Sequence, residues 1–455
     1  MGKYFGTDGF RGLVGKELLS IHAYKIGRFL GSYLKKEKGK GRVLIGKDTR
    51  VSSDIFENAI ASGIASSGAD VYKLGVITTP AVFYLTREKG FDFGVMISAS
   101  HNPFWDNGIK IMDGRGKIDE GLIEKIEEYI DNEESEIKTP SAKGDEVGKI
   151  ADFVEGRKEY VDFLVSACEC PLNGLKIGLD PSNGAGYSIC QEVFSSLGAD
   201  TYIINSEPNG ININEGCGST HIDALCRFVK EKGLDMGFAY DGDGDRCIGV
   251  NENGEAIDGD KIIYALATDL KERGELTADT VVTTVMSNGG LYKALNKAGI
   301  SHIETAVGDK YVSEMMINNG YSIGGEQSGH IIIGRYLETG DGILTSVKLA
   351  ELVKKNSSAF SSLTSEVKPL PQILKNVHVS DKNAILSSKL VEKARLEAKN
   401  RLSAQSGRIL LRPSGTEPLV RIMVEGESSD ECEKIAKAVE KAILKAEKEV
   451  AKNER

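Results

Sequence analysis

The chain repeats one local pattern, in which a short apolar strand is followed by an amphipathic helix and then by a second apolar strand. Residues 42–46 predict a strand, residues 54–67 a helix, and residues 71–74 the next strand. The same order of elements returns between residues 175 and 204. Strands and helices that alternate in this way are typical of an α/β fold.

The corner between helix and strand is also similar from one passage to the next. Residues 66–70 read Ser-Ser-Gly-Ala-Asp, residues 195–200 read Ser-Ser-Leu-Gly-Ala-Asp, and residues 297–303 give a looser third version. A glycine between a helix and a strand is common by itself. Three such corners in equivalent places favour internal repetition of one α/β unit.

At 455 residues the chain is too long for one hydrophobic core and predicts three or four domains. An acidic stretch at 131–136 suggests a loop, residues 251–255 a hairpin turn, and the serine-rich segment before Pro369 a linker. Apolar residues at helical spacing predict a helix from Ser429 to about residue 450. We therefore place domain boundaries at 1–153, 154–255, 256–368 and 369–455.

Charge and cysteine content exclude several classes of function. The net charge is −10, with 57 Lys and Arg against 67 Asp and Glu, and no basic stripe concentrates the positive charges. We therefore expect no nucleic-acid partner.

The seven cysteines are scattered, which predicts reduced thiols. No leader-like segment follows Met1 and no apolar run is long enough to cross a bilayer, so we expect a cytoplasmic protein without a membrane partner.

A serine beside a histidine follows a predicted buried strand at 91–97. The segment 98–103 reads Ser-Ala-Ser-His-Asn-Pro and lies at a strand's carboxyl end, where open α/β sheets bind ligands. Taken alone it could be an ordinary polar turn. Ser100 could act as a nucleophile, but no G-x-S-x-G elbow is present, which argues against a hydrolase triad.

Three aspartates alternate with glycines after the predicted strand 236–240. Asp241, Asp243 and Asp245 would repel one another without a cation, and oxygen ligands of this kind suit Mg²⁺ or Ca²⁺. A calcium-binding EF-hand loop is the obvious competitor, but Arg246 stands at its sixth position, where glycine is needed, and strands flank the segment. A solvated acidic turn is less favoured, because the residues that follow it look buried.

Two further segments suit a phosphorylated sugar. In residues 324–330, between two apolar strands, Glu326, Ser328 and His330 alternate and could project to one side of an extended segment, toward sugar hydroxyls. A polar strand end is the alternative. Residues 411–418, followed by Arg421, predict a phosphate cradle built from Arg412, Ser414, Gly415, Thr416 and Arg421, although such loops are often only turns.

Together the four segments describe phosphoryl transfer on a phosphosugar, with one segment in each predicted domain. With these motifs the chain resembles the α-D-phosphohexomutase family over essentially its whole length, from Gly6–Gly12 to Arg412–Pro418. The strings at 97–103, 106–110, 306–312 and 325–330 are most similar to bacterial members that act on glucosamine phosphates.

The resemblance implies four domains around a central cleft, namely three related α/β mixed-sheet units and a smaller C-terminal α+β domain. It also implies an isomerase that exchanges glucosamine 6-phosphate and glucosamine 1-phosphate. Phosphorylated Ser100 would give a 1,6-bisphosphate intermediate, and the product would feed the synthesis of UDP-N-acetylglucosamine and cell-wall precursors. The implied cofactors are one Mg²⁺ per chain, held by Asp241, Asp243, Asp245 and the phosphate on Ser100, and a hexosamine or hexose 1,6-bisphosphate as primer. Relatives suggest a homodimer.

The resemblance also implies roles for individual residues. Arg11, His101, Lys110 and Arg246 would surround the transferring phosphate. Lys110 is the preferred general base, with a pKa lowered by nearby cations, and His101 and His330 are its rivals. The sugar-hydroxyl contacts would be Glu326, Ser328 and His330, and the site for the non-reacting phosphate Arg412, Ser414, Gly415, Thr416 and Arg421.

Three alternatives stay open at this stage. A phosphomannomutase or phosphoglucomutase would use the same chemistry on another hexose phosphate. An aspartyl-phosphate phosphatase would use Asp241 and Asp243 and give no role to Ser100. A calcium-binding module without catalysis would use only the aspartates.

Overall fold

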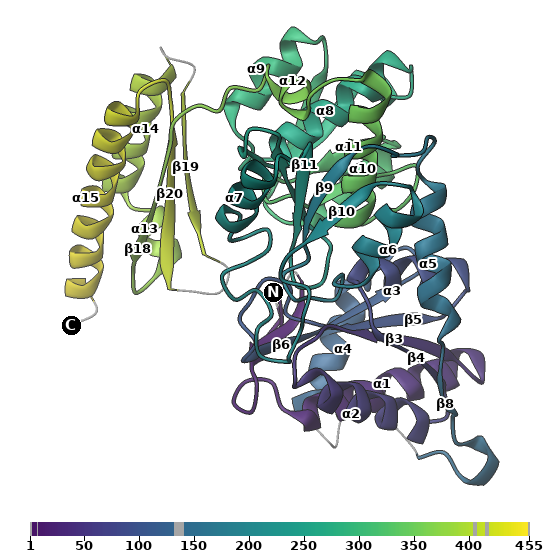
Figure 1. Ribbon diagram of the computed structural model, residues 1–455. Helices are drawn as coiled ribbons and strands as arrows, with labels where there is room; N and C mark the ends of the chain where they lie inside the picture. Colours follow the sequence, from purple (N-terminus) through teal and green to yellow (C-terminus); the bar gives the residue numbers. More distant parts are fainter. Residues whose placement is uncertain (1, 7, 132–140, 404–406, 415–417, 454–455) are drawn as a thin grey trace. The chain divides into compact units, whose positions relative to one another are not determined.

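The computed structural model describes residues 2–6, 8–131, 141–403, 407–414 and 418–453 (Figure 1). The predicted acidic loop at 131–136 therefore lies almost wholly outside the described residues. The chain forms two compact units: residues 1–286 with 298–365, and residues 287–297 with 366–455. Among the described residues, no helix combines the length and the apolar character needed to cross a membrane.

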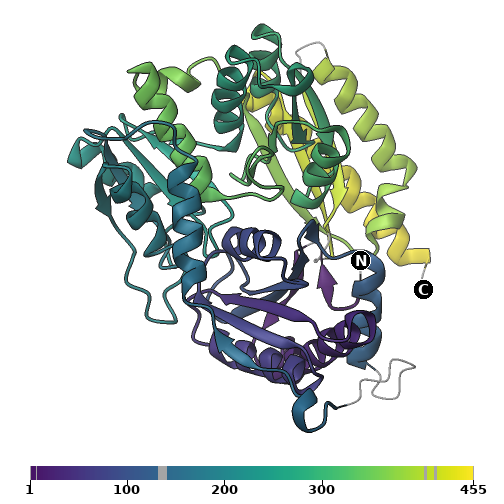
Figure 2. The same cartoon turned by 90° about the vertical axis from the view of Figure 1, so that its right-hand side faces the viewer.

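The first sheet has the order β1-β2-β6-β5-β3-β4-β8, with β7 paired to β6. Helices α1 and α2 cover one of its faces and α3 the other (Figure 1, Figure 2). Strand β3 pairs in parallel with β4 and β5, and β6 runs antiparallel to β5. The elements are β1 (Phe5–Gly6), β2 (Gly9–Leu13), α1 (Ser20–Lys38), β3 (Arg42–Lys47), α2 (Ser53–Ser66), β4 (Asp70–Val76), α3 (Thr79–Glu88), β5 (Phe93–Ile97), β6 (Asp106–Asp113), β7 (Gly116–Lys117), α4 (Glu120–Asp131) and β8 (Ile150–Asp152).

The second sheet has the order β10-β9-β11-β12-β13, and the third β15-β14-β16-β17. The second comprises β9 (Lys176–Asp180), β10 (Asp200–Ile203), β11 (Met236–Tyr240), β12 (Cys247–Asn251) and β13 (Ala256–Ile257), with α5 (Glu155–Ser166), α6 (Ile189–Ser196) and α7 (Asp223–Lys232). The third comprises β14 (Thr280–Thr284), β15 (Ser301–Thr305), β16 (Ile323–Gly325) and β17 (Ile331–Ile333), with α8 (Gly259–Glu272), α10 (Asp309–Asn319), α11 (Gly342–Asn356) and α12 (Phe360–Thr364).

The internal repetition expected from the sequence is confirmed in these three sheets. In each, a strand that follows the repeated corner pairs in parallel with an earlier strand: β4 with β3, β10 with β9, and β15 with β14. The corner residues Gly68, Gly198 and Gly299 have φ values of +104°, +85° and +66°, a region that favours glycine. The glycine at each corner is therefore required by the chain's turn from helix to strand.

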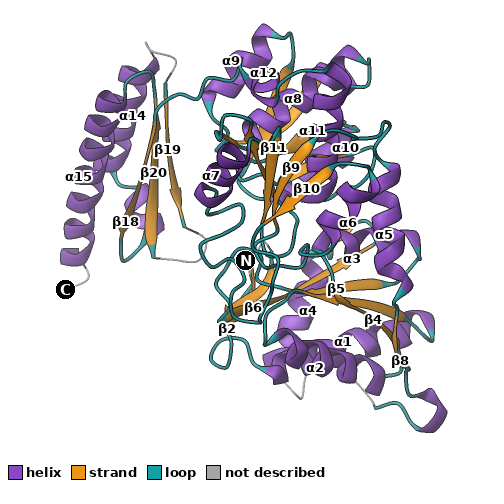
Figure 3. Ribbon diagram, in the orientation of Figure 1, coloured by secondary structure: helices purple, strands orange, loops and turns teal. Residues whose placement is uncertain are grey.

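The second unit contains an antiparallel sheet of order β18-β20-β19 (Figure 3). Its elements are α9 (Gly289–Lys297), β18 (Gln372–His378), α13 (Lys382–Leu386), α14 (Lys389–Ser403), β19 (Arg408–Pro413), β20 (Leu419–Glu425) and α15 (Ser429–Asn453). The C-terminal helix is confirmed, and its predicted inner residues Cys432, Ile435, Val439, Ile443 and Ala446 are all buried. With three α/β sheets and this α+β sheet, the predicted fold class is confirmed; the domain boundaries stay a prediction.

The start of α11 supports the turn between β11 and β12. Asp341 caps the helix, accepting hydrogen bonds from Leu344 N at 2.9 Å and from the Tyr160 hydroxyl at 2.8 Å. Gly342 N donates to the carbonyl of Gly244 at 3.0 Å, within that turn. Burial raises the pKa of Asp341 to about 6, because the charged carboxylate is poorly solvated there.

Replacing Asp341 by asparagine should change the pH dependence of stability. The folded-state pKa of Asp341 lies above its unfolded value, so the stability it contributes is present below about pH 4 and lost as pH rises through about 6. Asparagine can still accept from Leu344 N without burying a charge. The difference in melting temperature between Asp341→Asn and wild type should therefore rise in favour of the variant from pH 5 to pH 8. The corresponding gain in the free energy of unfolding is about 3 kcal/mol at most.

Asp381, the exposed cap of α13, provides the matched control. A pH-dependent gain of the same size in Asp381→Asn would contradict the explanation by burial.

Candidate active site

The serine loop, residues 98–103, follows β5 at the carboxyl end of the strand. Ser100 is fully buried and has a left-handed backbone with φ +50°, which costs a residue with a side chain about 1–3 kcal/mol. Its N–H donates to Ser98 Oγ at 3.0 Å, and its carbonyl accepts from Arg50 and Asn214. These contacts hold the serine in a strained conformation, as is frequent at functional sites.

The metal loop, residues 241–246, is the turn between the antiparallel strands β11 and β12. Asp241, Asp243 and Asp245 are at most 5% exposed, and each offers a carboxylate oxygen within 4.8 Å of the others. The predicted grouping of these three side chains is thus confirmed, and the strands on either side agree with the exclusion of an EF-hand.

The charges of the metal loop leave it suited to a divalent cation. Burial, together with the charges of Asp245 and Asp243, raises the pKa of Asp241 well above its ordinary value. Asp243 Oδ1 and Asp245 Oδ1 are buried and have no hydrogen-bond partner among the described residues. Buried carboxylate oxygens without partners are costly, and oxygen ligands of this type are what Mg²⁺ binds.

The serine loop and the metal loop are in direct contact although they lie far apart in the sequence. Ser100 Oγ donates a hydrogen bond to Asp241 Oδ2 at 2.6 Å, across 141 positions of the chain. Gly242 makes room for this approach, because a Cβ at that residue would lie 2.5 Å from the Ser100 carbonyl oxygen. The hydroxyl is thereby held at the edge of the carboxylate cluster.

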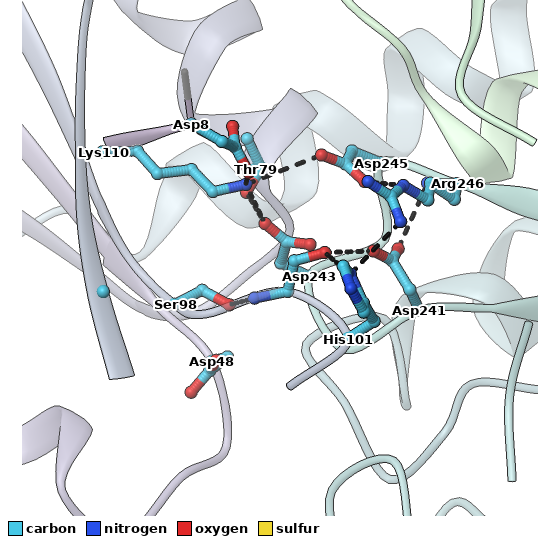
Figure 4. A network of polar contacts seen from close by, with 12 residues as sticks. Asp8, Asp48, Thr79, Ser98, His101, Lys110, Asp241, Asp243, Asp245 and Arg246 are labelled. Carbon is cyan, nitrogen blue, oxygen red and sulfur yellow. Dashed lines mark hydrogen bonds and ion pairs between the residues drawn. The ribbon is translucent and has the colours of Figure 1, made fainter. Parts of the chain in front are cut away.

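His101 and Arg246 also lie close to the carboxylate cluster (Figure 4). His101 Nδ1 is 3.3 Å from Ser100 Oγ and accepts from the Arg246 guanidinium at 3.2 Å. Burial, and after it the positive charges of Arg246 and Arg11, lowers the pKa of His101 to about 4. The imidazole is therefore neutral at physiological pH.

The environment of Lys110 differs from the expected one. Its ammonium group lies 2.7 Å from Asp243, 3.1 Å from Asp8 and 3.6 Å from Asp245 (Figure 4). Burial alone would lower the pKa of Lys110, but the three carboxylates outweigh burial and raise it. The expectation of a pKa lowered by nearby cations is wrong for this arrangement, because carboxylates are its closest charged neighbours, and Lys110 is positively charged.

A series of ion pairs continues from Lys110 to the start of α10, which belongs with the third sheet. Asp8 pairs with Arg11 and also accepts from Lys117 at 2.8 Å. The Lys117 ammonium then contacts Asp309 Oδ2 at 2.7 Å, at the start of α10. Loops of the first, second and third sheets thus meet around one charged site.

The segment of Glu326, Ser328 and His330 is a hairpin turn between β16 and β17, and the expected extended backbone is wrong. Glu326 N donates to the His330 carbonyl, and Gly329 N donates to the Glu326 carbonyl, each at 3.0 Å. The turn separates the three side chains: Ser328 is exposed, Glu326 is half-buried and His330 is buried. His330 Nε2 lies 3.7 Å from Asp309 and Glu326 Oε1 accepts from Gly308 N, so two of the three face the start of α10.

The predicted phosphate cradle lies in the second unit. Arg412 on β19 is paired directly with Arg421 on β20, and Ser414 is buried, 3.5 Å from the Arg421 guanidinium. Paired like charges are unfavourable on a sheet, so a bound anion would offset their repulsion. Gly415 and Thr416 lie outside the described residues.

Several site residues were not assigned a role from the sequence. They are Asp8, Arg50, Thr79, Lys117, Asn214 and Asp309. Asp8 and Asp309 stand inside strings that carried the family resemblance, so those strings were a usable signal. Asn214 lies in a polar loop without any motif, and only the tertiary contact reveals it.

Comparison with known proteins identifies the family. The chain matches the phosphoglucomutase/phosphomannomutase family in alpha/beta/alpha domain I over residues 2–137, domain II over 158–254, domain III over 258–370 and the C-terminal domain over 374–442. It is 52% identical to the phosphoglucosamine mutase of Lachnoclostridium phytofermentans, over 96% of this chain and 97% of that one. It is 46% identical to the phosphoglucosamine mutase of Bacillus subtilis, over 97% and 98%.

Solved structures of low sequence identity share the fold. A phosphoglucomutase/phosphomannomutase family protein from Burkholderia thailandensis aligns with a TM-score of 0.80 at 23% identity, over 98% of both chains. The Aspergillus fumigatus N-acetylphosphoglucosamine mutase, solved with GlcNAc-6P and magnesium, aligns with a TM-score of 0.72 at 17% identity, over 98% and 96%. The matches over all four domains and nearly the full length show that the chain belongs to the phosphoglucomutase/phosphomannomutase family.

Proposed function

We propose that the chain is a phosphoglucosamine mutase, which exchanges glucosamine 6-phosphate and glucosamine 1-phosphate. The observation that carries the proposal is the contact of Ser100 Oγ with Asp241, at the edge of three buried carboxylates. A hydroxyl beside a cation site is suited to accept and donate a phosphoryl group. Relatives named phosphoglucosamine mutase, 46–52% identical over nearly the whole chain, support the choice of sugar.

In this proposal Ser100 carries a phosphoryl group in the active enzyme. The bond from phosphorus to Ser100 Oγ breaks while a bond to the free sugar hydroxyl forms, which gives a 1,6-bisphosphate. After the bisphosphate has turned around, its other phosphoryl group returns to Ser100 Oγ. A 1,6-bisphosphate would also phosphorylate Ser100 initially, as primer.

The carboxylates Asp241, Asp243 and Asp245 would hold one Mg²⁺ together with the phosphate on Ser100. The unpartnered oxygens of Asp243 and Asp245 fit this ion. When bound, the ion would supply positive charge that stabilises the transferring phosphoryl group. Lys110 and Arg246, positively charged and close to the same carboxylates, would offset charge on the phosphoryl oxygens.

The proton of the attacking hydroxyl needs an acceptor with a free lone pair, which a protonated lysine lacks. Lys110 is protonated in this arrangement, whereas His101 is neutral at physiological pH and lies beside Ser100 Oγ. We therefore assign the proton acceptor to His101, which would pass the proton on to Ser100 Oγ as that oxygen leaves phosphorus. A weak base suffices, since phosphoryl transfer depends mostly on positioning and charge stabilisation.

The remaining predicted residues would bind the rest of the substrate. We assign the sugar hydroxyls to Glu326, Ser328 and His330, and the non-reacting phosphate to Arg412, Ser414 and Arg421 with Gly415 and Thr416. The paired arginines on β19 and β20 support an anion site. Because the intermediate turns around, each of its phosphates would occupy this site in turn.

The net charge of −10 supports the expectation that nucleic acid is not a partner. We further propose that the enzyme works in the cytoplasm as a homodimer and feeds UDP-N-acetylglucosamine and cell-wall precursor synthesis.

Ser100→Ala should abolish mutase turnover, by at least about a thousandfold, because no phosphoryl carrier would remain. The measurement is product formation from glucosamine 6-phosphate with Mg²⁺ and a 1,6-bisphosphate primer. The melting temperature should stay near that of wild type, because the change removes one small hydroxyl. Activity close to wild type would refute the role of Ser100.

Asp243→Asn should weaken Mg²⁺ binding by at least about tenfold, because one anionic ligand is lost. The Mg²⁺ concentration that gives half-maximal turnover measures the effect. Asp162→Asn, at an exposed position of α5, is the control and should leave that concentration unchanged. An unaltered Mg²⁺ response in Asp243→Asn would remove the ligand assignment.

Turnover on three substrates tests the choice of sugar. We expect kcat/KM for glucosamine 6-phosphate to exceed the values for glucose 6-phosphate and mannose 6-phosphate by at least about tenfold, the discrimination that one recognised polar group supports. A preference for glucose or mannose phosphate would instead identify a phosphoglucomutase or phosphomannomutase with the same mechanism.

A further inference from the structure

Two carbonyl groups of the serine loop, one buried and one partly buried, are each bound by the same two side chains. The carbonyls of Ser100 and Asn102 accept from the Arg50 guanidinium at 3.1 and 2.6 Å. They also accept from Asn214 Nδ2 at 2.8 and 3.0 Å. A carbonyl oxygen has two lone pairs, so each of these oxygens has its full set of donors.

The two donors come from different domains. Arg50 follows β3 in domain I, where its fully buried side chain pairs with Asp48, also fully buried. Asn214 belongs to domain II, in the connection between β10 and α7. Arg50 can therefore hold the serine loop only relative to its own domain, whereas Asn214 connects the loop to the domain that carries the metal loop.

Asn214 is itself fixed where three loops meet. Its backbone is left-handed, with φ +61°, which asparagine tolerates better than most residues, and its N–H donates to the Ser182 carbonyl at 2.9 Å. A Cβ at Gly242 of the metal loop would lie 2.9 Å from Asn214 Nδ2 and 2.5 Å from the Ser100 carbonyl oxygen. The carboxamide thus lies against both the serine loop and the metal loop.

We propose that Asn214 is a positioning residue for phosphoryl transfer, which holds the strained backbone of Ser100 in place relative to the metal loop. The inference rests on the proposed function of Ser100 as phosphoryl carrier. Without the carboxamide, Arg50 alone would bind the two carbonyls, and the backbone of the serine loop would lose its hydrogen bonds to Asn214 of domain II. Asn214 has no assigned contact with the sugar or with the distal phosphate, so its loss should affect the rate of transfer and not substrate affinity.

Asn214→Gly and Asn205→Gly form a matched pair for the test. Asn205 also has a left-handed backbone, with φ +51°, and donates its carboxamide to Asp180 at 3.0 Å. Glycine relieves backbone strain at both positions, so both variants should fold. Asn214→Asp is the second variant, because it keeps the shape of the side chain and removes its hydrogen-bond donors.

The kinetic expectation is a separation of kcat from KM. Asn214→Gly and Asn214→Asp should lower kcat at least about tenfold, since misplacing a reacting group by about 1 Å can cost about a hundredfold. KM should stay within about threefold of wild type, and Asn205→Gly should keep kcat within about twofold. Equal losses in Asn214→Gly and Asn205→Gly, or an unchanged kcat in both Asn214 variants, would overturn the proposal.

Hydrogen–deuterium exchange gives a readout that needs no activity. In the metal-free, unphosphorylated protein, the backbone amides of residues 98–102 should exchange faster in Asn214→Gly than in wild type or in Asn205→Gly. Unchanged exchange there would also overturn the proposal. If exchange responds as expected but the wild-type protein lacks mutase activity, the proposed function fails while the positioning of the serine loop by Asn214 stands.

Discussion

Three carboxylates buried within 4.8 Å of one another impose the main electrostatic constraint on this molecule. Burial, and after it the charges of Asp245 and Asp243, raises the pKa of Asp241, and compensating positive charge makes such a cluster tolerable inside a protein. Lys110 and Arg246 provide part of that charge, and a divalent cation would provide more. The cluster thereby dictates which side chains can surround it.

The positive charges that compensate these carboxylates connect residues of three sheets in one site. Lys110 comes from the first sheet and binds the aspartates of the second, while Lys117 connects Asp8 to Asp309 at the start of α10. Each ammonium group lies between carboxylates of different origin. Loops next to the three sheets are therefore held together by charge as well as by packing, and the serine loop lies among them.

Holding the serine loop takes more than its local sequence. Ser100 adopts a left-handed backbone that serine avoids by itself, and donors from Arg50 and Asn214 satisfy the carbonyls that this conformation presents. The strain is maintained by groups distant in the chain. Because the backbone has this conformation, the Ser100 hydroxyl lies 2.6 Å from Asp241, as a phosphoryl carrier beside a cation site would require.

The sequence by itself determined the α/β repeats, the C-terminal helix and the grouping of Asp241, Asp243 and Asp245, because periodicity and short spacing act locally. It placed Ser100 correctly at the end of a strand. Only the tertiary structure decided that Glu326 and His330 face the start of α10, that Lys110 lies among carboxylates and that Asn214 binds the serine loop. Those outcomes depend on contacts between distant residues, and a pKa or a hydrogen bond is set by whichever charges and donors folding brings together.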